Sequence, residues 1–283
     1  MQHSAPNLKL ASLVVLAALT LSAAQAEQRP AEDVMMRAIS GNAPEPEGRH
    51  VSYFEANEDT RGYLAMPDDD GPFPAVILIH EWNGLVDRIR QTADAFAEHG
   101  YIAFAADLYG GRTGSNREEN IELMREARSD EQRIIDNLDA AVEWLETNTP
   151  TTGRIATVGW CFGGGVALSY ALGGERHDGT AVFYGSLIDD PDQMRQVHHE
   201  VYGTFAEEDT GIPVDQVEAF VTAMRAAGID NDVHIYDAVD HGFWLYNERD
   251  PRDARPAAAH AWERLRAYLD RTIGPDAETT EEE

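Results

Sequence analysis

Short apolar runs alternate with longer segments of helical periodicity along most of this chain. Residues 74–79 and 101–105 are continuous apolar runs, as expected for strands buried on both faces of a parallel sheet. Between such runs, apolar residues recur every three or four positions, which predicts amphipathic helices. The pattern predicts strands at 50–54, 61–65, 74–79, 101–105, 155–160, 181–184, 201–206 and 233–236, and helices at 85–99, 214–227 and 257–272, with two more within 120–146. We therefore expect one α/β domain with a mostly parallel central sheet and helices on both faces.

A Gly-x-Cys-x-Gly sequence, centred on Cys161, follows the strand expected at 155–160. A nucleophile on a sharp strand-to-helix turn needs neighbours without a Cβ, so Gly159 and Gly163 predict a nucleophile elbow that carries a thiol. The helix start that follows favours a thiolate and a nearby oxyanion. The alternative is a structural cysteine, because free cysteines are often buried for packing alone.

Two further segments favour the catalytic interpretation. Asp209 follows the apolar run at 201–206, and His241 follows the strand expected at 233–236. Open α/β sheets build their sites at the carboxyl ends of strands. The chain order of nucleophile, acid and histidine is also that of α/β-hydrolases. Singly, a turn aspartate or a loop histidine indicates little, but the ordered set predicts a triad.

The strand at 74–79 ends in the segment His80-Glu81-Trp82. The backbone after such a strand and the residue after the nucleophile normally supply the oxyanion hole. We therefore expect the amides of Trp82 and Phe162 to bind the oxyanion. Glu81 is expected close to the thiol, although an ordinary strand-end carboxylate is the alternative.

These segments together resemble the dienelactone hydrolase family. The resemblance rests on the G-x-C-x-G-G elbow, the Glu-containing segment after the early strand, the Asp segment that ends in Ile212-Pro213, and the H-G-F segment that begins at His241. It spans about residues 50–272. Ala206 stands where the family's acid segment has glycine, and Ala106 replaces the proline of the P-D-L-Y segment.

The resemblance implies an α/β-hydrolase fold and a carboxylic ester hydrolase that acts on small esters or lactones. Cys161 would attack the carbonyl, His241 would move protons, Asp209 would orient the imidazole, and Glu81 would hold the thiol proton until substrate displaces it. No cofactor or metal is implied. A general carboxylesterase or thioesterase, or a catalytically silent scaffold used for binding, are the alternatives.

The substrate contacts are less defined by the sequence. Arginines on loops near the site could bind a substrate carboxylate, and aromatic side chains could line the pocket. The candidates are Arg112, Arg249, Arg252, Tyr109 and Trp244. Solvated arginines and core packing of Trp244 are the alternatives.

The N-terminal region has the features of an export signal. Lys9 precedes the apolar run at 10–21, and an Ala-x-Ala pattern ends at Ala26. We expect a signal peptide at 1–26, an arm at 27–49, the hydrolase domain at 50–273 and an acidic disordered tail at 274–283. The mature protein would be periplasmic or secreted, without stable membrane association. An uncleaved anchor is the alternative.

The formal net charge of −29, with 22 basic against 51 acidic residues, argues against nucleic-acid binding. It is consistent with a surface adapted to high salt, where repulsion between carboxylates is screened. A merely acidic secreted protein is the alternative. A monomer or a dimer that binds a small-molecule substrate is expected.

Overall fold

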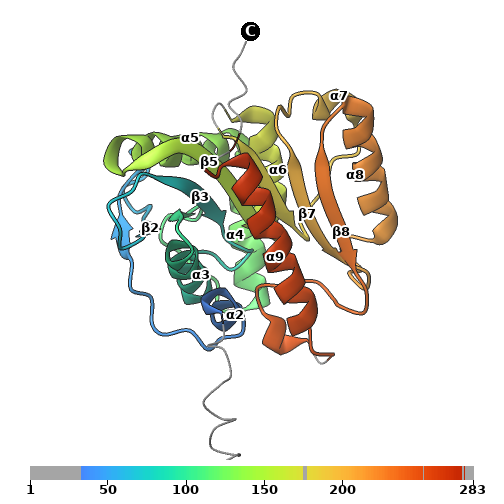
Figure 1. Ribbon diagram of the computed structural model, residues 1–283, viewed down its shortest axis with the longest axis horizontal. Coiled ribbons are helices and arrows are strands. Elements are labelled where there is room, and N and C mark those ends of the chain that lie inside the picture. The colour runs from blue at the N-terminus through green and yellow to red at the C-terminus, as the bar shows by residue number, and fades with distance from the viewer. Residues whose placement is uncertain (1–32, 175–176, 251, 276, 278–283) are drawn as a thin grey trace, which may run out of the picture. The chain divides into compact units, whose positions relative to one another are not determined.

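An eight-stranded sheet organises the part of the chain that the computed structural model describes, which is residues 33–174, 177–250, 252–275 and 277 (Figure 1). The strand order is β1-β2-β4-β3-β5-β6-β7-β8. The first two strands join antiparallel at one side, and the other six are parallel. The strands are β1 (Arg49–Val51), β2 (Gly62–Ala65), β3 (Phe73–Ile79), β4 (Ile102–Ala106), β5 (Thr151–Trp160), β6 (Gly179–Phe183), β7 (Val201–Ala206) and β8 (Asn231–Tyr236).

Helices cover both faces of this sheet. Figure 1 shows α3 and α9 on the viewer's side of it. The helices are α2 (Val34–Ile39), α3 (Asp87–Glu98), α4 (Arg117–Arg128), α5 (Glu131–Asn148), α6 (Phe162–Gly173), α7 (Pro191–Met194), α8 (Val214–Ala227) and α9 (Arg255–Thr272), with a 3₁₀ turn η1 at Asn247–Arg249. The expected mostly parallel sheet with helices on both faces is therefore confirmed.

Strand β3 shows how the apolar run becomes a two-sided core. Ala75, Ile77 and Ile79 pack on the face covered by α4, α5 and α6, whereas Val76 and Leu78 pack on the face covered by α2, α3 and α9. All five side chains are fully buried. Because side chains alternate along a strand, only a continuous apolar run can bury both faces in this way.

The segment expected to be an arm contains a helix. Met35 and Ile39 of α2 are fully buried against the core, and each such side chain contributes about 2 kcal/mol of hydrophobic stabilisation. With six residues the helix has fewer than two turns, which is too short for a helical periodicity to be recognised in the sequence. The predicted signal segment and most of the acidic tail lie outside the described residues. In the described part, no helix has the length and hydropathy needed to cross a membrane.

The parallel strands place the predicted chemistry at one edge. Because β3, β5, β7 and β8 run in the same direction, their carboxyl ends lie along the same edge of the sheet. Glu81, Cys161, Asp209 and His241 each follow one of these strands.

Candidate active site

Cys161 lies on a strained turn between β5 and α6. Its backbone has φ 54° and ψ −112°, a conformation that residues with a side chain rarely adopt. Its amide donates to Phe183 O at 3.0 Å, and its carbonyl accepts from the amides of Gly164 and Gly165. These bonds hold the turn and leave the partly exposed thiol at the N-terminus of α6.

The glycines of the elbow have a steric role. A Cβ on Gly159 would lie 2.0 Å from Gly163 O, and a Cβ on Gly163 would lie 2.1 Å from Ile79 O. Neither contact is possible, because backbone atoms cannot move away without opening the sheet. The first turn of α6 therefore packs directly on the ends of β3 and β5.

Asp209, His241 and Cys161 form one chain of hydrogen bonds. His241 Nδ1 lies 2.6 Å from Asp209 Oδ2, and the Cys161 side chain is the second hydrogen-bonding partner of the same ring. The second oxygen of Asp209 accepts from the amides of Gly211 (2.8 Å) and Ile212 (3.1 Å). The carboxylate is thus fixed in orientation, and only 2% of its side chain is exposed.

The charges in this chain are set by these partners. Burial alone would raise the pKa of Asp209, but the hydrogen bonds from His241 and the two amides hold that pKa below its usual range. Burial alone would lower the pKa of His241, but the hydrogen bonds to Asp209 and Cys161 raise it to about 10. An imidazolium facing the sulfur is therefore favoured at neutral pH, which suits a thiolate.

Glu81 is a buried acid that follows β3. It is 6% exposed, and within the described residues its carboxylate accepts no hydrogen bond. Burial raises the pKa of Glu81 to about 7, although the charges of His241, Arg249 and Arg88 oppose that rise. This carboxyl group therefore changes charge near neutral pH beside the imidazole.

The amides of Trp82 and Phe162 are free to donate. Phe162 is the first residue of α6, so its N–H has no partner within the helix. Trp82 lies in the turn after β3, where Gly84 N donates to Glu81 O at 3.3 Å. In the described part of the chain, neither of these two amides has an acceptor.

A cavity of about 550 Å³ lies against the thiol and the imidazole. Its walls carry charges of both signs. They include Glu81, Trp82, Arg117, Cys161, Asp240, His241, Tyr246, Arg249, Asp250 and Arg252. Such a space fits a small organic molecule.

The comparisons with known proteins agree with this geometry. Residues 60–273, about three quarters of the chain, match the family model described as the dienelactone hydrolase family. The chain belongs to the dienelactone hydrolase family. It is therefore a hydrolase with the α/β-hydrolase fold, as the resemblance implied.

Two relatives and one solved structure illustrate the similarity. A Yersinia pestis protein named a carboxymethylenebutenolidase is 27% identical over 227 residues, which are 74% of this chain and 82% of the relative. An Aquifex aeolicus protein of the same name is 29% identical over 227 residues, covering 76% and 95%. The crystal structure described as a Klebsiella pneumoniae dienelactone hydrolase has a TM-score of 0.70 at 24% identity, covering 80% of this chain and 98% of that one.

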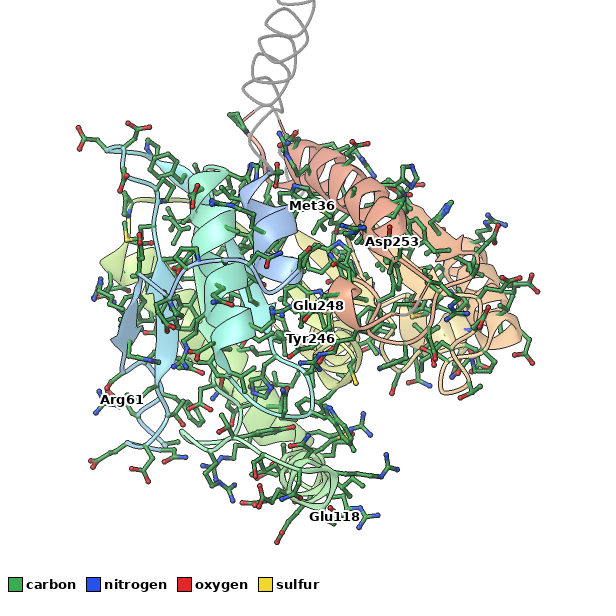
Figure 2. All side chains as sticks on the ribbon, turned by 90° about the horizontal axis from the view of Figure 1, so that it is seen from below. Met36, Arg61, Glu118, Tyr246, Glu248 and Asp253 are labelled. Atoms are coloured by element: carbon green, nitrogen blue, oxygen red, sulfur yellow. The ribbon has the colours of Figure 1, made fainter. Side chains whose placement is uncertain are left out.

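Two of the arginines expected at the site of this family member do line the cavity. Arg249 stacks on the Tyr246 ring at 3.7 Å, and Arg252 pairs with Glu208 and with Asp250. Figure 2 labels Tyr246 and Glu248, which belong to the segment that carries Arg249.

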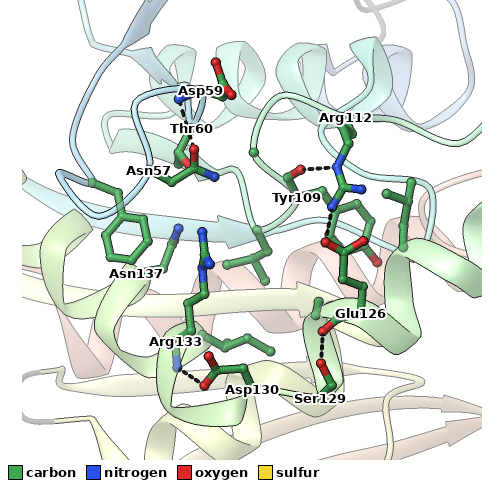
Figure 3. Close-up of a pocket in the computed structure, with 16 residues that line it drawn as sticks. Asn57, Asp59, Thr60, Tyr109, Arg112, Glu126, Ser129, Asp130, Arg133 and Asn137 are labelled. Atoms are coloured by element: carbon green, nitrogen blue, oxygen red, sulfur yellow. Dashed lines mark hydrogen bonds and ion pairs between the residues drawn. The ribbon is translucent and has the colours of Figure 1, made fainter.

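Arg112 and Tyr109 line a second cavity, of about 490 Å³ (Figure 3). Arg112 donates to Tyr109 O at 3.0 Å and pairs with Glu126 at 2.8 Å, so its guanidinium is already engaged. The Tyr109 hydroxyl instead points the other way and donates to Trp82 O at 3.2 Å. Arg112 therefore lines the second cavity and not the thiol cavity, whereas Tyr109 hydrogen-bonds the loop of Trp82 and lies close enough to Cys161 to interact with its charge.

Trp244 is a core residue, and its expected place in the pocket is wrong. It is fully buried, stacks on Trp160 at 5.6 Å, and donates from its indole N–H to Ala258 O. Three residues after His241, the chain has already turned back into the core beneath α9. Core packing was the alternative that the sequence left open for this residue.

Sequence reasoning missed Arg117 and Tyr246. Arg117 begins α4 and lies over the Trp82 ring at 5.9 Å, and it pairs with no carboxylate within the described residues. A helix start after the loop that follows β4 was a usable signal, because that loop leaves the carboxyl edge of the sheet.

Among the described residues, no group of three histidine, cysteine or acidic side chains is arranged to hold a metal ion.

Proposed function

We propose that this dienelactone hydrolase family member hydrolyses ester or lactone bonds of small substrates through a cysteine nucleophile, Cys161. One observation carries the proposal, namely the hydrogen-bonded chain from Asp209 through His241 to Cys161 at the strained elbow. A structural cysteine would need neither the strain nor the imidazole, and strain of this kind is costly unless a function maintains it.

In the first half of the reaction, the Cys161 thiolate attacks the carbonyl carbon. The negative charge that develops on the carbonyl oxygen is stabilised by the amides of Trp82 and Phe162. The tetrahedral intermediate collapses, the carbon–oxygen bond breaks, and the leaving oxygen takes the proton from His241 Nε2. The product of this half is a thioester on Cys161 and a neutral imidazole. In a lactone, the released hydroxyl stays attached to the acyl group.

In the second half, water replaces the leaving group. His241 takes a proton from the water while the water oxygen attacks the thioester carbon, and the same two amides hold the oxyanion. Collapse releases the carboxylic acid and the thiolate, and His241 keeps the proton. The resting ion pair is thus restored. Asp209 orients the imidazole and stabilises its charge in both halves.

Three carboxylates and three arginines line the cavity, and the arginines favour a substrate that carries an anionic group. Arg117, Arg249 and Arg252 all line it, and two of them hold no strong ion pair with a carboxylate in the described part of the chain. Guanidinium groups bind carboxylates in a bidentate manner. The relatives' name, carboxymethylenebutenolidase, denotes an enzyme whose substrate is a lactone with a carboxyl-bearing substituent. We infer that substrate class for this chain.

The test compares the wild-type protein with Cys161→Ala on a panel of chromogenic esters, thioesters, and neutral and carboxylate-bearing lactones. We expect Cys161→Ala to lower kcat/KM by at least about 10⁴-fold while the unfolding midpoint stays near that of the wild type. Iodoacetamide should inactivate the wild type, and substrate should slow that inactivation.

The panel also separates the alternatives. Comparable activity on neutral simple esters and thioesters would identify a general esterase or thioesterase. No turnover of any substrate by a folded wild-type protein would favour a binding scaffold. Hydrolysis retained by Cys161→Ala within a few-fold would defeat the covalent mechanism.

A further inference from the structure

His80 is a fully buried polar ring at the end of β3, beside the site but outside its cavity. Its Nδ1 lies 2.7 Å from Glu81 O, and its Nε2 lies 3.3 Å from Leu108 N. A carbonyl oxygen only accepts and an amide N–H only donates. The ring must therefore be neutral, with its proton on Nδ1, so that both nitrogens are satisfied.

The same ring contacts the loops that follow three neighbouring strands. It meets the Tyr109 ring edge-on at 4.6 Å and lies parallel to the Phe162 ring at 6.1 Å. Tyr109 in turn donates its hydroxyl to Trp82 O at 3.2 Å. His80 thus touches the β3 loop, the β4 loop and the start of α6 at once.

Two of these loops supply the amides that the proposed mechanism uses. Trp82 follows the carbonyl to which His80 donates, and Phe162 carries the ring on which His80 packs. The backbone of His80 is also packed closely against the first turn of α6. A Cβ on Gly163 would lie only 2.6 Å from His80 O. A shift of this ring would therefore move one donor relative to the other.

We propose that His80 is a positioning residue that sets the separation of the two oxyanion-hole amides, through its hydrogen bonds to Glu81 and Leu108 and its ring contacts with Tyr109 and Phe162. This inference rests on the proposed function. It assigns no proton transfer to His80, because both of its ring nitrogens are occupied by backbone groups. A ring present only for packing would be replaceable by phenylalanine without loss of rate.

The experiment compares His80→Phe, which keeps a ring but leaves the two backbone groups unpaired, with His80→Gln, which can donate and accept. For each, kcat and KM for an ester are measured beside the rate of alkylation of Cys161 by iodoacetamide. Alkylation needs the thiolate but produces no oxyanion. Since losing one oxyanion donor costs about 10²–10³-fold, misplacing one should lower kcat of His80→Phe by about 10- to 100-fold.

We expect KM and the alkylation rate of His80→Phe to stay within about threefold of wild type, and His80→Gln to recover most of kcat. The matched control is Tyr202→Phe, which removes two buried hydrogen bonds away from these loops: the Tyr202 hydroxyl donates to Ala261 O at 2.8 Å and accepts from Thr204 Oγ1 at 2.7 Å. It should lower the unfolding midpoint without lowering kcat.

Three results would overturn the proposal: an unchanged kcat in folded His80→Phe, an equal fall in kcat and alkylation, or no recovery in His80→Gln. If His80→Phe does not fold, Tyr109→Phe tests the proposal instead, because it removes only the hydroxyl that donates to Trp82 O. We expect kcat of Tyr109→Phe to be about three- to tenfold lower with a normal alkylation rate. An unchanged kcat would refute the proposed coupling of these loops to the oxyanion-hole amides. Failure of the proposed function is separate, since it would appear as no hydrolysis by the wild type.

Discussion

Imidazoles with shifted pKa values lie at both edges of the sheet, and the two shifts have opposite directions. His241 is at the carboxyl edge, after β8, whereas His177 and His199 precede β6 and β7 at the amino edge. The pKa of His241 is raised to about 10, while burial lowers the pKa of His177 to about 3 and that of His199 to about 4.

The difference lies in the partners. His177 and His199 share the hydroxyl of Thr180, at 3.0 and 2.8 Å, and their rings are 4.6 Å apart. In the described part of the chain, neither ring contacts a carboxylate. A hydroxyl gives no compensation for a buried positive charge, and each imidazole would repel a charge on the other.

At the carboxyl edge, the buried carboxylate of Asp209 and the sulfur of Cys161 both face the imidazole. The His241 side chain is 37% exposed and His177 and His199 are half-buried, so burial is not what raises the pKa of His241. His241 differs from the other two because the carboxylate of Asp209 and the side chain of Cys161 both hydrogen-bond its ring. The amino-edge pair is, by the same reasoning, a structural element.

The largest expected effect comes from removing that partner. Asp209→Asn should lower kcat/KM by about 10³–10⁴-fold, because the amide can stabilise the wrong tautomer and cannot offset the imidazolium charge. The pKa of His241 should fall, since the hydrogen bond to Asp209 is a main cause of its rise. The pH dependence of iodoacetamide alkylation and an NMR titration of the His241 ring measure the two effects.

Asp178→Asn is a matched control for Asp209→Asn. Asp178 is also a carboxylate at a strand end that accepts a hydrogen bond from a backbone amide, that of Ile155 at 2.8 Å, but it is half-buried and lies at the amino edge. Its substitution should leave kcat/KM within about threefold of wild type. An Asp209→Asn protein with near-normal kcat/KM would remove Asp209 from the catalytic chain.

The amino-edge pair predicts a loss of stability in acid. Because the folded-state pKa values of His177 and His199 lie below the ordinary value of 6.5, the unfolded chain binds protons first as the pH falls. Their contribution is complete above about pH 7 and is lost between about pH 6.5 and 3. From about 1.36 kcal/mol per pKa unit, the free energy of unfolding should drop by about 2–4 kcal/mol between pH 8 and pH 5 through these two groups.

Denaturant unfolding of the wild type and of His177→Gln/His199→Gln at several pH values measures this drop. The double variant should be less pH-dependent in that window, whatever its stability at pH 8. Parallel pH profiles for the two proteins would mean that these imidazoles are not the groups responsible.

At the carboxyl edge, most of the candidate site could be predicted from the sequence. The elbow around Cys161 and the positions of Asp209 and His241 followed from local rules, because a strand end and a glycine turn leave a residue-level pattern. Since the strands are parallel, residues that follow their carboxyl ends lie at one edge of the sheet. This could be predicted without knowing the strand order.

The rest depended on contacts between segments far apart in the chain. Arg117 and Arg112 both lie near the loop after β4, yet only Arg117 lines the thiol cavity, because Arg112 turns to Glu126 on α4. The histidine pair was not anticipated, since His177 and His199 meet only through the pairing of β6 with β7. Burial of Trp244 and of α2 likewise depends on how distant helices pack.

The smallest of these effects concerns Glu81, a buried acid at the functional edge that lacks the partners of Asp209. Its pKa of about 7, raised by burial, means that the folded state binds a proton more tightly than the unfolded chain does. Stability should therefore fall as the pH rises from about 4.5 through 7, and Glu81→Gln should remove this penalty. We expect the free energy of unfolding of Glu81→Gln at pH 8 to exceed that of the wild type by about 1–3 kcal/mol, and the gain to vanish near pH 4.

In the same Glu81→Gln variant, the pH profile of the alkylation rate of Cys161 should lose its inflection near pH 7, and the rate itself should change by less than about tenfold. Denaturant unfolding and alkylation across pH 4–9 test both. A variant that is more stable yet catalytically altered would show that this edge keeps an unpaired acid for function rather than for the fold, whereas lower stability at pH 8 with an unchanged pH profile would assign Glu81 a structural role.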